Sequence, residues 1–403
     1  MPRESSPESV PFARRHIGPD GRGRDHDAEG DRPRRGPLTG ARTPLHAEHD
    51  ALGAVLTSFA GWRMPLRYDS ELAEHRAVRT AAGLFDLSHM GEIEVSGPQA
   101  GAALDHALAG ELSAVGIGRA KYSLLCSTEG TVLDDLVVYR LAEDRFLAVV
   151  NAANTADDVA ELARRAEGFD ATITDRSAET ALVAIQGPRS AEILRGLVPS
   201  GQADTVVTLR YYAAVPATVA GHEVLLARTG YTGEDGFELY LPAARAPAIW
   251  RDLLAAGRPA GLVPAGLACR DTLRLEAGMP LHGQELSSTI DPYSAGLGRV
   301  VRLGKPFVGR DALGLLAERD PERRLVGLRG TGRRAARTGY LVVAGDGSVV
   351  GRITSGALSP TLGHPIALGY VDAALAGPGT ELAVDIRGRP EPYLVVTPPF
   401  YRR

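Results

Sequence analysis

Hydrophobic and polar residues alternate with a period of two in several parts of the chain, a pattern that predicts β-strands because alternate side chains of a strand share one face. The alternation is clearest in residues 91–97, 131–140 and 145–151. Helical patterns lie at Glu71 to Ala81 and at Ala156 to Ala166, the second with a polar face. Strand and helix signals then alternate through Leu239 without a regular strand–helix–strand rhythm. The pattern therefore predicts an α+β fold rather than a doubly wound sheet.

The two ends of the chain have different patterns. After about Ala317, short strand signals recur between Gly, Asp and Pro residues, at 325–328, 340–343, 349–353, 366–371, 382–386 and 393–397. Strands at this spacing predict a small β-barrel or sandwich, and the charged run 319–324 is expected to be a linker. Residues 1–42 are rich in Arg, Asp, Gly and Pro with few large apolar residues. Such a segment buries too little to offset its ordering entropy, so we expect disorder there.

Composition narrows the class of protein. A chain of 403 residues is expected to form two to three domains, and 44% hydrophobic residues are enough for a sizeable core. A net charge of −4 does not call for nucleic acid or an anionic membrane as a partner. No apolar stretch approaches the ~20 residues of a membrane helix, and we expect no secretory signal. Cys126 and Cys269 cannot form a disulfide framework. We expect a cytoplasmic protein.

Two adjacent carboxylates, Asp134 and Asp135, interrupt the apolar strand predicted at 131–140. Neighbouring strand residues point to opposite faces, so Asp135 shares its face with Tyr139 and Asp134 lies on the other. One carboxylate must therefore enter apolar surroundings, where burial is costly and raises its pKa. Such a shift suits a proton acceptor that works near neutrality. The alternative is a turn before the strand, in which Asp caps backbone N–H groups.

Residues 228–240 hold three glycines within seven residues, followed by Phe237-Glu238-Leu239-Tyr240. The glycines allow close backbone approach, but no Lys-Ser/Thr pair or helix signal follows, so the segment is not a phosphate loop. Phe237 and Leu239 are expected to face the core, and Glu238 and Tyr240 to face solvent or a cleft. A carboxylate there could accept two parallel N–H bonds from an amidine-like ring edge. The alternative is a solvent-facing Glu on a hairpin.

The short helix predicted at 266–278 carries two arginines. Arg270 and Arg274 can pair locally with Asp271 or Glu276. Arg270 can instead bind an anionic or carbonyl group of a ligand.

The histidines and the common catalytic motifs give no sign of a metal or of covalent catalysis. HExxH, paired CxxC, G-x-S-x-G and a Rossmann fingerprint are all absent from the sequence. We therefore expect no metal site. His89 is expected to be structural, with a hydrogen bond across a turn.

Several phrases of the sequence are more specific together than any one is alone. They are Thr43–Leu45, Gly61–Leu66, Gly83–Met90, Leu133–Leu136, Val150–Asn154, Gln186–Pro188, Thr229–Glu234, Gly266–Glu276, Thr354–Gly356 and Ser359–Gly363. In these phrases and their order the chain resembles the glycine cleavage T-protein family, from about Thr43 to Arg402.

The resemblance implies a three-lobed cloverleaf fold with a central folate-binding hole. Two interleaved α+β lobes would form a catalytic region at 43–316, and the C-terminal β-barrel would occupy 317–403. The implied activity is that of an aminomethyltransferase. A lipoyl carrier, the H-protein, presents an aminomethyl group, and tetrahydrofolate takes the methylene as ammonia leaves. Other glycine cleavage system proteins are further implied partners, and we expect a monomer.

The resemblance also implies site residues. The family's essential aspartate falls in the Asp134–Asp135 pair; we favour Asp135, and Asp134 stays open because a register shift of one residue would exchange them. Its role would be to accept or hold the proton of folate N10, or to stabilise iminium character as ammonia leaves. Glu238 corresponds to the pterin-binding acid and Arg270 to the arginine of that site. Further residues expected on the wall are Tyr122, Tyr139, Asn151, Tyr211 and Tyr231. The tail at 399–402 could close the hole.

Related activities fit less well. Folate domains of sarcosine and dimethylglycine dehydrogenases resemble this fold but are fused to flavin domains, for which this chain has no fingerprint. A branch tied to tRNA modification and iron–sulfur assembly carries a cysteine motif, and the matching stretch here, 278–285, keeps Gly-Gln-Glu without the cysteine. Two other classes stay open: a folate-binding regulatory protein without turnover, and a structural subunit of a carrier complex.

Overall fold

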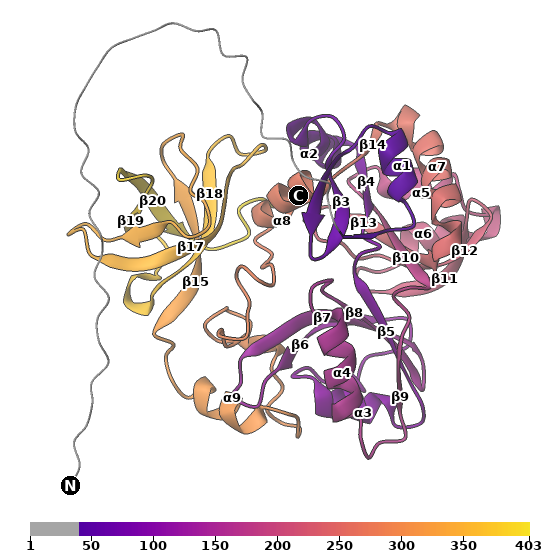
Figure 1. The fold of residues 1–403 in the computed structure, drawn as a ribbon, viewed down its shortest axis with the longest axis horizontal. Helices are drawn as coiled ribbons and strands as arrows, with labels where there is room; N and C mark the ends of the chain where they lie inside the picture. The colour runs from indigo at the N-terminus through magenta and orange to yellow at the C-terminus, as the bar shows by residue number, and fades with distance from the viewer. Residues whose placement is uncertain (1–39) are drawn as a thin grey trace, which may run out of the picture. The chain divides into compact units, whose positions relative to one another are not determined.

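A computed structural model describes residues 40–403, and its largest sheet has six strands in the order β11-β12-β13-β10-β4-β14 (Figure 1). All neighbours in this sheet are antiparallel except β14, which pairs in parallel with β4. The strands are β4 (Ala82–Asp86), β10 (Thr180–Gln186), β11 (Ala214–Val219), β12 (His222–Ala227), β13 (Gly236–Pro242) and β14 (Leu262–Pro264).

Three helices, α5 (Ser190–Arg195), α6 (Ala203–Thr208) and α7 (Ala246–Gly257), cover one face of the six-stranded sheet (Figure 1). Helix α7 has a proline in its first turn and buries Ile249, Trp250, Leu253 and Leu254, whose spacing forms one apolar stripe. Phe237 and Leu239 of β13 point into this core and are fully buried. Because side chains alternate along a strand, Glu238 and Tyr240 point to the opposite face.

A second sheet has five antiparallel strands in the order β6-β7-β8-β5-β9. They are β5 (Gly91–Ser96), β6 (Ala120–Cys126), β7 (Val132–Ala142), β8 (Arg145–Val150) and β9 (Thr172–Asp175). Helices α3 (Ala100–Ala107) and α4 (Thr155–Arg165) pack on one face, over Ile93, Leu136 and Phe146. On the other face Tyr139 and Val149 belong to a core that also contains Leu182 and Tyr240 of the first sheet. The two sheets thus face each other across this shared core.

The chain path interleaves the two sheets. It enters the six-stranded sheet at β4, builds the whole five-stranded sheet, and returns at β10. After α8 (Leu267–Glu276) it crosses back, and α9 (Arg310–Ala317) packs Leu313 against Cys126 and Val132 of the second sheet. The mixture of antiparallel sheets and helices confirms the α+β prediction.

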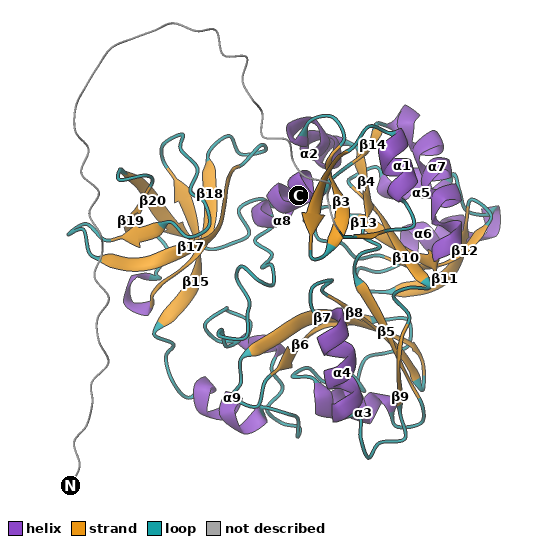
Figure 2. Ribbon diagram, in the orientation of Figure 1, coloured by secondary structure: helices purple, strands orange, loops and turns teal. Residues whose placement is uncertain are grey.

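The last six strands close into a barrel in the order β15-β18-β17-β16-β19-β20 (Figure 2). They are β15 (Arg323–Gly330), β16 (Leu341–Val343), β17 (Val349–Leu358), β18 (Pro365–Asp372), β19 (Glu381–Asp385) and β20 (Pro390–Val396). The expected linker at 319–324 is too long by two residues, because Arg323 and Arg324 already pair with Asp372 and Val371 of β18.

A small sheet precedes these units, with β1 (Ala41–Arg42) parallel to β3 (Trp62–Arg67) and β2 (Val55–Phe59) antiparallel to β3. Helices α1 (His46–Ala51) and α2 (Glu71–Thr80) follow β1 and β3. The disorder expected for 1–42 is not met at Ala41 and Arg42, because their backbone groups pair with Trp62 and Arg63. Residues 1–39, on which the rest of that expectation falls, lie outside the described residues.

Helix α8 joins the barrel to the rest of the described chain. Its last residue, Glu276, is fully buried and accepts hydrogen bonds from Arg79 of α2 and from Thr361 in the β17–β18 loop. The helix ends at Gly278, whose φ of +68° favours glycine. A Cβ there would lie 2.5 Å from Pro398, so glycine also lets the C-terminal segment approach.

Candidate functional site

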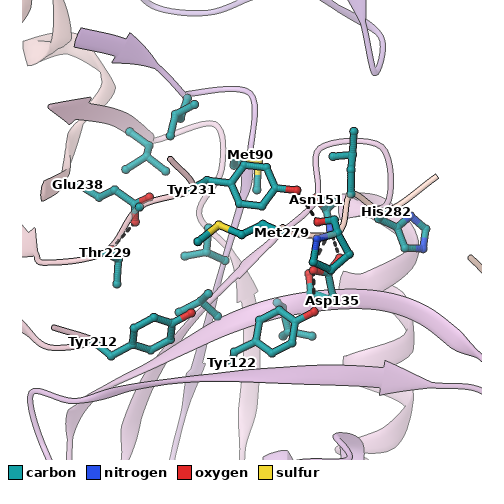
Figure 3. Close-up of a pocket in the computed structure, with 18 of the residues that line it drawn as sticks. Met90, Tyr122, Asp135, Asn151, Tyr212, Thr229, Tyr231, Glu238, Met279 and His282 are labelled. Carbon is teal, nitrogen blue, oxygen red and sulfur yellow. Dashed lines mark hydrogen bonds between the residues drawn. The ribbon is translucent and has the colours of Figure 1, made fainter. Parts of the chain in front are cut away.

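A cavity of about 280 Å³ lies in the space between the inner faces of the two sheets. Strands β7 and β8 supply one wall, β13 supplies another, and α8 and the segment 279–282 complete it. Figure 3 shows Glu238 and Thr229 at one end, Asp135, Asn151 and His282 at the other, and Tyr231 and Met279 between them. We call this space the central cavity.

Asp135 lies on the central cavity wall with both carboxylate oxygens engaged. Its Oδ2 accepts a hydrogen bond from the Tyr122 hydroxyl at 3.0 Å, and its Oδ1 accepts one from Asn151 Nδ2 at 2.9 Å. Burial, together with the charge of Asp134, raises the pKa of Asp135 to about 6. A carboxylate with that pKa can take up and release a proton close to neutral pH.

Asp134 points to the other face of β7, away from the cavity. It is fully buried and accepts hydrogen bonds from the backbone N–H and Nδ2 of Asn151 at 3.0 and 2.7 Å, and from Asn154 Nδ2 at 2.8 Å. Asn151 therefore connects the two aspartates, because its Nδ2 also donates to Asp135. In β7, Asp135 and Tyr139 therefore share the face toward the cavity and Asp134 lies on the opposite face, which is the arrangement that the sequence predicted.

A third carboxyl group, Asp158 of α4, is buried beside Asp134. Its side chain is 3% exposed, and no donor among the described residues reaches its Oδ2. Burial, and then its hydrogen bond with Asp134, raises the pKa of Asp158. Burial beside a second carboxyl group therefore favours the protonated form of Asp158.

Glu238 forms the opposite end of the central cavity. Its Oε2 accepts hydrogen bonds from Thr229 Oγ1 at 2.5 Å, from the Tyr240 hydroxyl at 3.2 Å and from the Tyr139 hydroxyl at 3.3 Å. No donor to its Oε1 is present among residues 40–403. Burial raises the pKa of Glu238. Oε2 of Glu238 is thus fixed by three hydroxyl groups, and Oε1 is available to accept hydrogen bonds from a ligand in the cavity.

Arg270 of α8 lies over the Tyr231 ring, with 4.5 Å between its Cζ and the ring centroid. In contrast, Arg274 pairs with Asp271 at 2.7 Å and with Glu285 at 2.9 Å. Within the described residues Arg270 makes no ion pair, although it lines the cavity. Of the two arginines, Arg270 is therefore the one whose guanidinium is available to a ligand.

Most of the residues expected at the site do line the central cavity. They are Tyr122, Asp135, Tyr139, Asn151, Tyr231, Glu238 and Arg270. Tyr211 does not: its side chain is 51% exposed, and the wall position belongs to Tyr212. Tyr212 adopts a left-handed φ of +58°, which turns it inward and leaves Tyr211 on the surface. The two rings pack edge to face, with centroids 4.9 Å apart.

Two further expectations are wrong in detail. His89 makes no hydrogen bond across a turn, because neither ring nitrogen has a partner among the described residues. Burial, and then the charge of Arg270, lowers the pKa of His89 to about 4, so the ring is neutral. The C-terminal tail does not line the cavity: the Tyr401 N–H donates to the Glu276 carbonyl, and its ring packs on Arg79.

The sequence interpretation missed Met90, Tyr212, Thr229, Met279 and His282, which also line the central cavity. Met90 and Thr229 stand at the ends of two of the recognised phrases, which was a usable signal. His282 had none, because its place at the cavity depends on the path of the chain after α8.

Neither a metal cluster nor a membrane helix is found in the part of the chain that the structure describes. No group of three or more His, Cys, Asp or Glu side chains in residues 40–403 is arranged to hold a metal ion. No helix there is both long and apolar enough to span a bilayer.

Two family models match the chain. The GCVT N-terminal domain matches residues 45–305, and the glycine cleavage T-protein C-terminal barrel domain matches residues 323–402. The fold is also similar to a crystal structure of the glycine cleavage system aminomethyltransferase T from Bartonella henselae. The TM-score is 0.83, with 37% identity over 90% of this chain and 98% of that one.

Curated relatives agree with the family models. An aminomethyltransferase from Saccharopolyspora erythraea is 58% identical over 90% of this chain and 98% of its own length. One from Streptomyces avermitilis is also 58% identical, over 90% and 97%. The chain therefore belongs to the glycine cleavage T-protein family. It is an aminomethyltransferase of the glycine cleavage system, with the α+β T-protein fold and C-terminal barrel that the sequence predicted.

Proposed function

We propose that the central cavity binds tetrahydrofolate and that the H-protein delivers an aminomethyl group to it on a lipoyl arm. In this reaction the methylene carbon loses its bonds to sulfur and to nitrogen and gains bonds to two nitrogens of the folate. Two N–H protons leave the folate; one ends on the lipoyl thiol and one on the departing ammonia. Bound tetrahydrofolate would supply the two nitrogens, and the protein would supply orientation and a proton acceptor.

The polar groups left open in the cavity fit the pterin end of a folate. Glu238 Oε1 is an acceptor without a donor among the described residues, and adjacent N–H groups on a ring edge would satisfy it. Arg270 is a donor without an ion-pair partner and would bind a ring carbonyl. Tyr122, Tyr212 and Tyr231 offer aromatic faces to a flat ligand.

The observation that carries the proposal is Asp135, a buried carboxylate at the end of the cavity opposite Glu238. A ligand anchored at Glu238 would extend toward Asp135, where the lipoyl arm must also arrive. We assign Asp135 the role of accepting or holding a proton of the folate while the methylene is transferred, for which its pKa of about 6 is suited. Tyr122 and Asn151 would keep its oxygens in place.

The test uses aminomethyl-loaded H-protein with and without tetrahydrofolate, and follows ammonia and methylenetetrahydrofolate. Asp135→Asn keeps the shape of the side chain and removes its charge. We expect it to lower folate-dependent turnover by about 10²–10⁴-fold while folate still binds. Asp157→Asn, at an exposed position of α4, is the matched control and is expected to keep full activity.

Three other results would change the proposal. Full activity of Asp135→Asn together with loss in Asp134→Asn would move the proton-accepting role to the other aspartate. Turnover that does not depend on tetrahydrofolate would remove folate as the acceptor. Tight folate binding without any product would leave a folate-binding regulatory protein.

A further inference from the structure

His282 lies between the central cavity and a second pocket that opens to solvent. The second pocket has a volume of about 590 Å³ and is lined by Asn154 and by residues of α4. Asp157 and Ser288 on its wall are exposed, so solvent reaches it. His282 is the one residue that lines both spaces in the part of the chain that the structure describes. We call the second space the outer pocket.

One hydrogen bond fixes the ring of His282 in this position. Asn154 Nδ2 lies 3.1 Å from the Nδ1 of His282 and also donates to Asp134 Oδ1 at 2.8 Å. Because an amide nitrogen only donates, Nδ1 of the ring is the acceptor. Nε2 of the ring is buried and has no partner among residues 40–403. The bond from Asn154 is therefore the polar contact that holds the ring between the two spaces.

Asp134 connects this bond to the end of the central cavity where Asp135 lies. Its Oδ1 accepts a second hydrogen bond, at 2.7 Å, from Asn151 Nδ2. That nitrogen in turn donates to Asp135 Oδ1 at 2.9 Å. One buried carboxylate thus helps to place both Asp135 and His282, and Figure 3 shows these two side chains at the same end of the cavity. The side chain that separates the cavity from the outer pocket is therefore close to the proposed site of methylene transfer.

The backbone of residues 279–282 forms a wall of the central cavity, because all four residues line it. The segment runs between Gly278 and Gly283, whose φ values of +68° and +85° favour glycine. The Tyr231 hydroxyl donates a hydrogen bond to the carbonyl of Pro280 in its middle. The wall is thus fixed at Pro280 by Tyr231 and at His282 by Asn154.

Water that reached the methylene during transfer would compete with the folate for it. The water oxygen would bond to the methylene carbon as its bonds to sulfur and to nitrogen break. The two hydrogens of the water would end on the lipoyl thiol and on the departing ammonia. The products would be formaldehyde, ammonia and the dihydrolipoyl arm, without methylenetetrahydrofolate. A closed wall prevents hydrolysis of this kind in enzyme sites.

We propose that the His282 side chain is a barrier that keeps water of the outer pocket from the methylene, an inference that rests on the proposed function. The barrier determines which of two acceptors, the folate or water, receives the carbon. Its effect depends on the volume of the ring and on its position, which Asn154 fixes. His282 is therefore a residue that determines the products of the reaction without taking part in proton transfer.

The experiment uses the complete chain with aminomethyl-loaded H-protein and saturating tetrahydrofolate. Ammonia, formaldehyde and methylenetetrahydrofolate are measured together, with the last trapped enzymatically as it forms. His282→Ala removes the ring, and His282→Phe keeps a ring of similar size without the acceptor nitrogen. His222→Ala is the matched control, because His222 lines neither space. Circular dichroism would establish that each variant is folded.

We expect the wild type and the control to release ammonia and methylenetetrahydrofolate in equal amounts. In His282→Ala the formaldehyde formed per methylenetetrahydrofolate should rise about tenfold or more, which corresponds to a barrier to hydrolysis lower by about 1.4 kcal/mol. His282→Phe should stay close to the wild type, because its ring still fills the space.

A product ratio in His282→Ala equal to that of the wild type would overturn the inference even if turnover falls, because a purely structural role lowers all products together. An equal rise in His282→Phe and His282→Ala would also overturn it, since the volume of the ring would then be irrelevant. A higher KM for the loaded H-protein without formaldehyde would assign the outer pocket to the carrier and overturn it as well. Failure of the proposed function looks different, because the wild type itself would then form no methylenetetrahydrofolate.

Discussion

Asp134 and Asp135 are neighbours in the chain and have different surroundings, because a strand turns adjacent side chains to opposite faces. Asp134 accepts hydrogen bonds from Asn151 and Asn154 and lies against Asp158, whereas Asp135 faces the cavity. The negative charge of Asp134 is one cause of the raised pKa of Asp135. The first aspartate thus helps to set the protonation behaviour of the second.

The pH dependence of turnover follows from this arrangement. If ionised Asp135 accepts the proton, kcat/KM is expected to rise with pH through a step near 6, which is the pKa that burial and Asp134 give it. Stopped-flow turnover between pH 5 and 8 would measure the step, and Asp135→Asn should lose it together with most of the activity. A rate that is flat across this range in the wild type would exclude titration of Asp135 as the limiting ionisation.

We expect Asp158 to affect the pH dependence of stability rather than turnover. Its pKa in the folded state is raised above the unfolded value of about 3.9, so the folded protein binds one more proton above that pH. Its contribution to stability is therefore lost as pH rises, by up to about 1.4 kcal/mol per pH unit. Asp158→Asn removes this dependence. The free energy of unfolding of the variant should therefore increase relative to that of the wild type as pH rises from 5 to 7.

Urea denaturation at pH 5, 6 and 7 measures the difference, with Asp157→Asn as the control at the adjacent exposed position. The control should follow the wild type at each pH. Parallel curves for Asp158→Asn and the wild type would mean that Asp158 is not protonated in the folded protein.

Single residues were predictable where strand alternation alone decides the direction of a side chain. That rule was enough to place Glu238 opposite Phe237 and Leu239, and Asp135 on the same face as Tyr139, and all of these cavity-facing side chains line the cavity. Tyr211 was expected on the wall from the family resemblance alone, and the left-handed φ of Tyr212, which no glycine marks in the sequence, places Tyr212 there instead. The hydrogen bond predicted for His89 was wrong for another reason, because its neighbours Phe59 and Arg270 come from distant segments.

Among the elements, α8 connects the site to the barrel, because it contacts both. Arg270 near its start lines the central cavity, and Glu276 at its end binds Arg79, His75, Ser359 and Thr361. Burial opposes ionisation of Glu276, but hydrogen bonds from His75, Ser359 and Arg79 outweigh it and lower its pKa to about 2. The stabilisation by this carboxylate is therefore present above pH ~4.3 and is lost as pH falls toward 2.

Glu276→Gln is expected to cost about 3 kcal/mol, because it leaves the buried Arg79 with one ion pair fewer and removes an acceptor from Ser359 or Thr361. Glu48→Gln removes an ion pair to Arg251, whose side chain is 66% exposed, and should cost less than about 1 kcal/mol. Equilibrium denaturation at pH 7 compares the two variants. Equal losses in the free energy of unfolding would show that the buried hydrogen bonds of Glu276 stabilise the protein no more than the exposed ion pair of Glu48.

The positions of the strands along the sequence were more predictable than the way in which the strands pair. The strands expected at 91–97, 131–140 and 145–151 are β5, β7 and β8, with ends shifted by no more than two residues. The barrel strands were found because each is a short apolar run between turn residues. The order β15-β18-β17-β16-β19-β20 was not predictable, because pairing of β15 with both β18 and β20 depends on contacts between distant segments.

At the scale of the whole molecule, the path of the chain places the site between units that are far apart in sequence. The central cavity takes Asp135 and Asn151 from the five-stranded sheet and Glu238 from the six-stranded sheet. None of its lining residues comes from the barrel strands that the structure describes. Besides α8 and the segment that follows it, α2 contacts the barrel, through the hydrogen bond between His75 and Thr361.

Binding of tetrahydrofolate is accordingly expected to stabilise more than the cavity. At a concentration one hundred times its Kd, a ligand of the folded state adds about 2.7 kcal/mol, or roughly 2–4 °C in Tm for a chain of this size. If α8 transmits the effect, amide hydrogen exchange at Thr361 and Leu362, next to Glu276 and Ser359, should also slow. In Glu276→Gln the cavity should still be protected, but this loop should not respond. Protection confined to the cavity wall in the wild type would mean that the barrel opens independently of the folate site.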